Sequence, residues 1–118
     1  MRPVSTPLPD RKARVAAVNF DFPAQPAAEV EACDLCGSRV FVVITHTDRY
    51  GYPAPACACT GCGLVFLNPR MTGAAYARFY EHAYRPLVSA YHGRLIDART
   101  VQAEQRDYAE QLVRFLRP

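Results

Sequence analysis

The sequence of 118 residues contains no long apolar run. No stretch approaches the ~20 apolar residues that a membrane-spanning helix needs, so we expect no membrane partner. The longest apolar run near the N-terminus, residues 15–18, is far too short for the apolar core of a signal peptide. We therefore expect a soluble, cytoplasmic protein with reduced thiols.

Runs of like charge are also absent. The formal net charge is +3, and the densest basic group, Arg11, Lys12 and Arg14, is diluted by Asp10 and Asp21. Nucleic-acid binding depends on clustered cations that meet the phosphate backbone. The scattered charges give no such cluster, so we do not expect a nucleic-acid partner.

Glycine is scarce, and none follows Gly93. The one G-x-G sequence, Gly61 to Gly63, surrounds a cysteine instead of following a strand and opening a helix. Nucleotide-type cofactors on Rossmann-like folds are held by a glycine-rich turn between a strand and a helix. We expect no such cofactor loop in this chain.

Cysteine, in contrast, occurs in an ordered pattern. Two C-x-x-C pairs, Cys33/Cys36 and Cys59/Cys62, are each followed directly by glycine. A C-x-x-C turn presents two thiolates to one metal ion, and a following glycine lets the backbone adopt positive φ. Two such turns, here called knuckles, supply the four ligands of a tetrahedral structural zinc site. The spacing between them fits an outgoing strand, a loop and a returning strand, which is the plan of a zinc ribbon.

Other interpretations of the cysteines are disfavoured. Disulfides would require an oxidising compartment, and a redox C-x-x-C normally stands alone at the start of a helix. Cys57 lies two residues before Cys59, so the two share a face of an extended segment, and we expect Cys57 to be buried. His46 is expected to be a loop residue, and His82 and His92 to lie in helical stretches.

The chain organises around this site. We predict a flexible proline-rich leader over residues 1–30, a four-cysteine zinc ribbon over residues 31–71, and a helical segment over residues 72–118. The β-branched run at residues 39–45 predicts a strand, and residues 56–60 and 64–67 predict two more. The expected fold class is α+β. Because the ribbon is too small to fold on apolar burial alone, we expect the metal to supply much of its stability.

Two helical stretches follow the ribbon. Thr72 predicts the N-cap of a short helix over residues 73–82 with an aromatic face. A second stretch, residues 86–116, begins with proline and is either one long helix or two helices that meet near Thr100. Its apolar residues at 112, 115 and 116 have no cover in this chain, so we expect a further domain or a second copy to meet them.

These residues carry a resemblance to a known family. The segment Cys59-Thr60-Gly61-Cys62-Gly63-Leu64-Val65-Phe66-Leu67-Asn68-Pro69-Arg70-Met71, with the first knuckle before it and the helix around Tyr76 after it, is similar to the N-terminal zinc-binding segment of bacterial class I S-adenosylmethionine-dependent methyltransferases. The similarity covers roughly residues 31–118. It implies that a Rossmann-like catalytic domain follows, with a helix ending like residues 112–116 leading into its first strand.

The resemblance also sets limits on activity. This chain has no cofactor-binding turn, so we expect no catalytic residues in it, and S-adenosylmethionine would be bound only by the parent enzyme. A catalytic domain in cis or in trans would be its partner. Asn68 and Arg70 are candidate substrate contacts: Arg70 would either pair with a phosphate or carboxylate or cap backbone carbonyls. The alternative function is a stand-alone zinc-ribbon adaptor that binds protein or nucleic acid.

Overall fold

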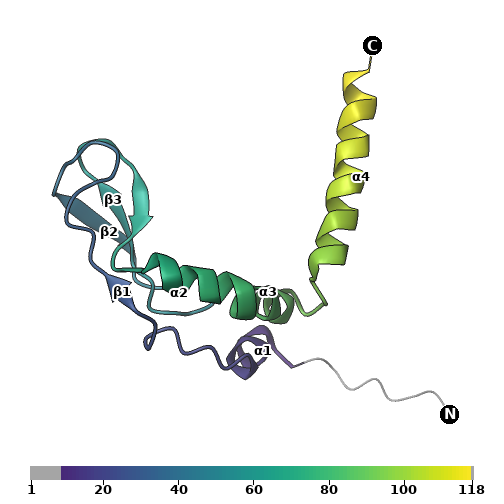
Figure 1. The fold of residues 1–118 in the computed structure, drawn as a ribbon, viewed down its shortest axis with the longest axis horizontal. Helices are drawn as coiled ribbons and strands as arrows, with labels where there is room; N and C mark the ends of the chain where they lie inside the picture. The colour runs from purple at the N-terminus through teal and green to yellow at the C-terminus, as the bar shows by residue number, and fades with distance from the viewer. Residues whose placement is uncertain (1–8, 118) are drawn as a thin grey trace. The chain divides into compact units, whose positions relative to one another are not determined.

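The computed structural model describes residues 9–117, which form an α+β fold of small antiparallel sheets and helices (Figure 1). The fold class expected from the sequence is confirmed. The chain divides into two compact units. One is Asn19–Glu81, here called the ribbon unit; the other, the helical unit, joins the described part of Met1–Val18 to that of His82–Pro118.

The ribbon unit is built on a three-stranded antiparallel sheet in the order β2-β3-β4. Its strands are β2 (Phe41–Thr45), β3 (Ala56–Cys59) and β4 (Val65–Leu67). All three lie where the β-branched and apolar runs predict them, with ends shorter by one or two residues. A second sheet pairs β1 (Ala27–Ala28) with β5 (Arg70–Met71).

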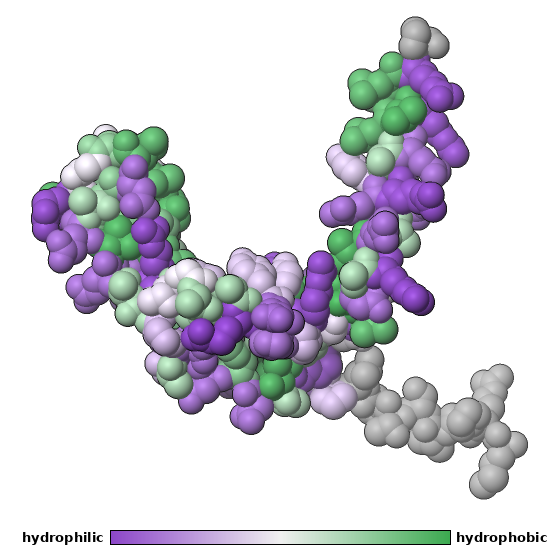
Figure 2. Space-filling model, in the orientation of Figure 1, coloured by the Kyte–Doolittle hydropathy of each residue, from purple (hydrophilic) through white to green (hydrophobic). Residues whose placement is uncertain are grey.

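The two faces of the three-stranded sheet differ in burial. Cys57 pairs with Val43 on one side and Phe66 on the other, and it is 4% exposed, which confirms the expected burial. On the opposite face, Val42 and Val65 flank Ala58 and stay more than half exposed. Apolar residues are visible at the surface of this sheet in Figure 2. An antiparallel sheet commonly has a polar outer face, and this one does not.

Aromatic rings join the segment before the ribbon to the rest of the ribbon unit. Phe22 stacks on Tyr52 with ring centroids 5.3 Å apart, and Phe20 lies 5.9 Å from Tyr52 and 5.2 Å from Phe79. The backbone N–H groups of Tyr50 and Tyr52 donate to the Asp48 carboxylate and fix the loop between β2 and β3. Residues 19–30, which the sequence pattern placed in a flexible leader, therefore belong to the ribbon unit.

Helix α2 (Gly73–Arg78) starts as predicted, because the Thr72 hydroxyl accepts a hydrogen bond from the Ala75 N–H at 3.3 Å. It continues through a π-helical turn, η1 (Phe79–Ala83), into α3 (Tyr84–His92). The prediction of a helix ending at His82 and another beginning at Pro86 was wrong. A proline ring inside a helix clashes with the carbonyl four residues earlier, and a widened π turn relieves that crowding.

The helical unit begins with α1 (Arg11–Ala17), a helix that the leader interpretation missed. Its Arg14 guanidinium donates to the carbonyls of Ala90 and Tyr91 at the end of α3, at 2.8 and 3.3 Å. A seven-residue helix is marginal alone and gains its stability from such packing, so periodicity could not predict it. Residues 1–8 of the predicted leader lie outside the described residues.

Helix α3 ends at Gly93, whose φ of 69° is left-handed, and α4 (Ala98–Leu116) begins after the N-cap Asp97. A Cβ at Gly93 would lie 3.2 Å from the Arg14 guanidinium. Two helices therefore replace one long helix, and the break lies before Thr100, which sits inside the first turn of α4. None of the helices in residues 9–117 is long and apolar enough to cross a membrane.

Candidate metal centre

The four paired cysteines converge in space. The Sγ atoms of Cys33, Cys36, Cys59 and Cys62 all lie within 4.8 Å of one another. Sulfur atoms of the two knuckles lie close together: Cys33 Sγ is 3.6 Å from Cys62 Sγ, and Cys36 Sγ is 3.5 Å from Cys59 Sγ. Zinc–sulfur bonds of about 2.3 Å place tetrahedral sulfurs about 3.8 Å apart. The donor set and its spacing therefore fit a metal ion such as zinc.

The two knuckles share one backbone pattern. In the first, the Gly37 N–H donates to the Cys33 carbonyl at 2.9 Å; in the second, the Gly63 N–H donates to the Cys59 carbonyl at 2.8 Å. Gly37 and Gly63 have φ of 75° and 78°. This confirms the positive φ predicted for the glycine after each pair, a conformation that costs an L side chain free energy.

Each knuckle buries its first cysteine and exposes its second. Cys33 and Cys59 are 4% and 2% exposed, whereas Cys36 and Cys62 are open to solvent. The knuckles lie close together at Gly61, where a Cβ would lie 3.1 Å from the Ser38 Cβ and 3.3 Å from the Cys36 Sγ. The sequence pattern does not reveal this close approach, because it depends on Ser38 and Cys36 of the other knuckle.

The thiols have strongly different proton affinities. Burial raises the pKa of Cys59, but hydrogen bonds from the backbone N–H groups of Cys62 and Gly61, and from neighbouring thiols, lower it to about 6. The Leu64 backbone N–H lowers the pKa of Cys62, but desolvation and the neighbouring thiols outweigh it and raise the value to about 12. Four adjacent sulfurs cannot all become anionic without a cation among them. A divalent metal ion would supply the positive charge that this arrangement needs.

An ion pair joins the segment after the second knuckle to the first knuckle. The Arg70 guanidinium donates to the Asp34 carboxylate at 2.8 Å, and Asp34 lies between Cys33 and Cys36. The hydrogen bond and the negative charge of Asp34 raise the pKa of Arg70. Sequence reasoning missed Asp34, because its partner is 36 residues away and no local pattern links them.

The Asn68 side chain forms two hydrogen bonds with the backbone of Val30. Its side-chain oxygen accepts from the Val30 N–H at 2.9 Å, and its amide group donates to the Val30 carbonyl at 3.2 Å. The side chain thus mimics a strand neighbour, and the Asn68–Pro69 peptide bond is cis. In the ribbon unit, the backbone of Val30 therefore engages Asn68, and the carboxylate of Asp34 engages Arg70.

The other candidate ligands lie apart from this centre. Among residues 9–117, the four cysteines form the one cluster of three or more metal-ligating side chains, and neither Cys57 nor His46 belongs to it. The ribbon unit also contains a hollow of about 250 Å³ next to β5. Its lining is mostly apolar and consists of Phe22, Pro23, Gln25, Ala27, Pro53, Pro69 and Met71.

Fold and site together define a small α+β segment with a four-cysteine cluster of zinc-ribbon type. Comparison with protein-family models, with curated proteins and with solved structures finds no match for this chain.

Proposed function

We propose that this chain is the zinc-binding module of an S-adenosylmethionine-dependent methyltransferase whose catalytic domain is supplied in cis or in trans. The observation that carries the metal half of the proposal is the convergence of four cysteine sulfurs within 4.8 Å. The methyltransferase half rests on the resemblance of residues 59–71 to that family. Under this proposal the module supports methyl transfer to a small-molecule acceptor and catalyses nothing alone.

Zinc in this module would have a structural role. Four thiolates fill a tetrahedral coordination shell, so no position is left open for water or substrate. The bound ion would neutralise the sulfurs and hold the two knuckles together. The Arg70–Asp34 pair and the Asn68–Val30 hydrogen bonds would then keep the segment after the second knuckle in a fixed place.

Arg70 is the stronger of the two proposed substrate contacts. Both polar atoms of the Asn68 side chain are engaged by Val30. The Arg70 side chain is 42% exposed, and a guanidinium has five N–H donors, so it can hold Asp34 and still meet a phosphate or carboxylate of the acceptor.

Metal content tests the first half of the proposal. After purification under reducing conditions, we expect one zinc ion per chain by elemental analysis and loss of ribbon structure on chelation. Cys59→Ser should lower zinc affinity by several orders of magnitude, whereas Cys57→Ala, a buried cysteine outside the cluster, should keep full zinc content. Zinc-free protein with an intact fold would overturn the proposal.

Reading the coding DNA beyond the codon for Pro118 tests the second half. We expect a continuation, or a neighbouring frame, that encodes a hydrophobic strand followed by an acidic glycine-rich turn. Calorimetry should show no binding of S-adenosylmethionine to this chain alone. Unrelated sequence downstream would contradict the methyltransferase assignment but would not affect the zinc-site proposal.

One observation favours the alternative, a stand-alone adaptor that binds protein. The outer face of the three-stranded sheet exposes Val42 and Val65, an apolar surface without charged groups between them. Such a surface suits protein contacts better than a phosphate backbone. In that case, the DNA downstream would encode no methyltransferase domain, and alanine substitutions on this face would abolish partner binding without loss of zinc.

A further inference from the structure

Helix α4 carries a largely apolar seam, interrupted by Gln105, that nothing in the described part of the chain covers. None of its residues is buried, and Tyr108 and Phe115 are 63% and 84% exposed. The seam residues recur at alternating intervals of three and four, which is the heptad spacing of a coiled coil. They are Ala98, Val101, Gln105, Tyr108, Leu112 and Phe115.

Charged side chains on α4 avoid this seam. The positions that flank it are Gln102, Glu104, Ala109, Gln111 and Leu116. Glu104 is the one charged residue among them, and it already pairs with Arg94 of the same chain at 2.9 Å. Close apposition of two such seams therefore brings no unpaired charges together.

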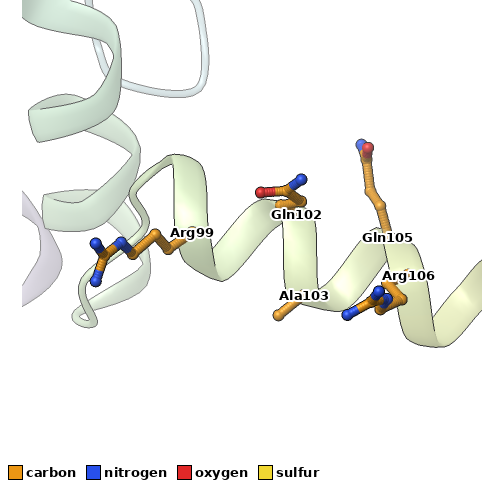
Figure 3. Close-up of a pocket in the computed structure, with 5 residues that line it drawn as sticks. All are labelled: Arg99, Gln102, Ala103, Gln105 and Arg106. Atoms are coloured by element: carbon orange, nitrogen blue, oxygen red, sulfur yellow. The ribbon is translucent and has the colours of Figure 1, made fainter.

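The hollow beside α4 is a less promising site. It is lined by Arg99, Gln102, Ala103, Gln105 and Arg106, all from this one helix. Figure 3 shows the two glutamines projecting from one side of the helix and Ala103 and Arg106 from the other. A small molecule would meet no second wall there, whereas another helix would lie along the whole seam.

We propose that α4 pairs in antiparallel orientation with α4 of a second copy of this chain. In an antiparallel pair, positions a and d of the heptad lie opposite each other. One alignment opposes the seam residues as follows: Ala98 to Phe115, Val101 to Leu112, and Gln105 to Tyr108. Two of these layers join a smaller side chain to a larger one, and the third joins an amide to a hydroxyl that can hydrogen-bond. In a parallel pair, Phe115 would instead face Phe115 of the second copy, and Ala98 would face Ala98 of the second copy.

The buried area is enough for a weak dimer. Two 19-residue helices joined along this seam would bury on the order of 1,000 Å² in total, near the lower limit of specific interfaces. The seam spans fewer than the three to four heptads of a free-standing coiled coil. We therefore expect a weak dimer whose population depends on concentration. This pairing needs no catalytic domain, so it stands or falls apart from the methyltransferase proposal.

Sedimentation equilibrium of the zinc-loaded full chain, from about 1 to 500 µM under reducing conditions, tests the pairing. The mass should rise with concentration from 13.2 kDa toward twice that value. Leu112→Glu, on the seam, should weaken association at least tenfold, whereas Val113→Glu, on the neighbouring exposed position, should change it less than twofold. A chain that stays monomeric at every concentration, or equal effects of the two variants, would overturn the proposal and point to another occupant of the seam.

The orientation has a separate test. Gln105→Lys alone should weaken the dimer, because it buries an ammonium group in the seam without a carboxylate partner. Adding Tyr108→Glu should restore association only in the antiparallel alignment, where the two new side chains face each other across the interface. In a parallel pair, like charges would stack and the double variant would be weaker still. Circular dichroism of each variant checks that α4 stays helical.

Discussion

The Nη1 atom of Arg70 lies 2.8 Å from the Oδ2 atom of Asp34, so an ion pair joins β5 to the loop of the first cysteine knuckle. Asp34 is adjacent to Cys33, and Arg70 follows the cis Asn68–Pro69 bond. The pair therefore connects the segment after the second knuckle to the loop of the first knuckle.

Arg70→Ala should make the metal site more labile. Loss of the pair frees the first knuckle to open, and we expect zinc transfer to a chromogenic chelator to become about two- to fivefold faster. Arg39→Ala is the matched control, because Arg39 pairs with Glu31 at 3.3 Å in a more exposed position. Equal rates for the two variants would mean that the Arg70–Asp34 pair does not hold the knuckle.

Metal binding should depend on pH through the thiols. The pKa of Cys62 in the metal-free site is about 12, so this thiol is protonated at pH 7 and must lose its proton when a metal binds. The Ser38 backbone N–H lowers the pKa of Cys36, but the neighbouring Cys59 thiol raises it and the net shift is upward, so Cys36 is also protonated at pH 7. The pKa of Cys59 is about 6, so below that pH a further proton competes with the metal. Affinity should therefore fall as the pH falls, and more steeply below pH 6 than above it.

Competition titrations with a zinc-sensitive dye between pH 5 and 8 measure this dependence. Calorimetry at pH 7 in buffers with different ionisation enthalpies counts the released protons directly. A pH-independent affinity, or no proton release at pH 7, would show that the cysteine thiols are already ionised before the metal binds.

The sequence was sufficient to predict the local features of the ribbon. The C-x-x-C-G repeat predicts both knuckles because turn, ligands and positive φ are all encoded within five residues. The β2 strand and the Thr72 N-cap follow for the same reason. Features that depend on distant partners could not be predicted. The Asp34–Arg70 ion pair and the Asn68–Val30 hydrogen bonds each join residues more than 30 positions apart in the chain.

The helices show the same limit. The leader looked unstructured because α1 is short and its Arg14 contacts at the end of α3 are distant in the chain. The one local signal is Asp10, which caps the start of α1 by accepting a hydrogen bond from the Ala13 N–H. The sequence pattern left open one long helix or two helices that meet near Thr100, and the structure has two helices with the break a few residues earlier. Gly93 and the capping residue Asp97 were the better signals, since a left-handed glycine ends a helix and an aspartate begins one.

Asp97 predicts an acid-sensitive start of α4. The Thr100 backbone N–H donates to the Asp97 carboxylate at 2.9 Å and lowers its pKa, a shift that burial opposes. Because the folded pKa lies below the unfolded value of about 3.9, the stabilisation is present above that value and is lost as the pH falls through the folded pKa. Helix content by circular dichroism should therefore decrease below about pH 4.

Asp97→Asn is the control for this effect. Asparagine caps helices about as well as aspartate but does not titrate. The variant should keep helix content near that of the parent chain at pH 7 and lose the part of the acid transition that belongs to α4. An unchanged acid transition would assign it to other carboxylates.

Gly61→Ala should weaken the metal site even though the residue binds no metal. An added Cβ would lie 3.1 Å from the Ser38 Cβ and 3.3 Å from the Cys36 Sγ, so one knuckle must move away from the other. We expect at least tenfold weaker zinc binding in competition titrations, since metal sites tolerate little displacement of their ligands.

Gly73→Ala is the matched control, because its Cβ meets nothing within 4 Å at the start of α2. That variant should bind zinc normally and unfold at a slightly higher temperature, since alanine favours helix over glycine by about 0.5–1 kcal/mol. Equal zinc affinities for the two variants would show that the knuckles can separate without cost.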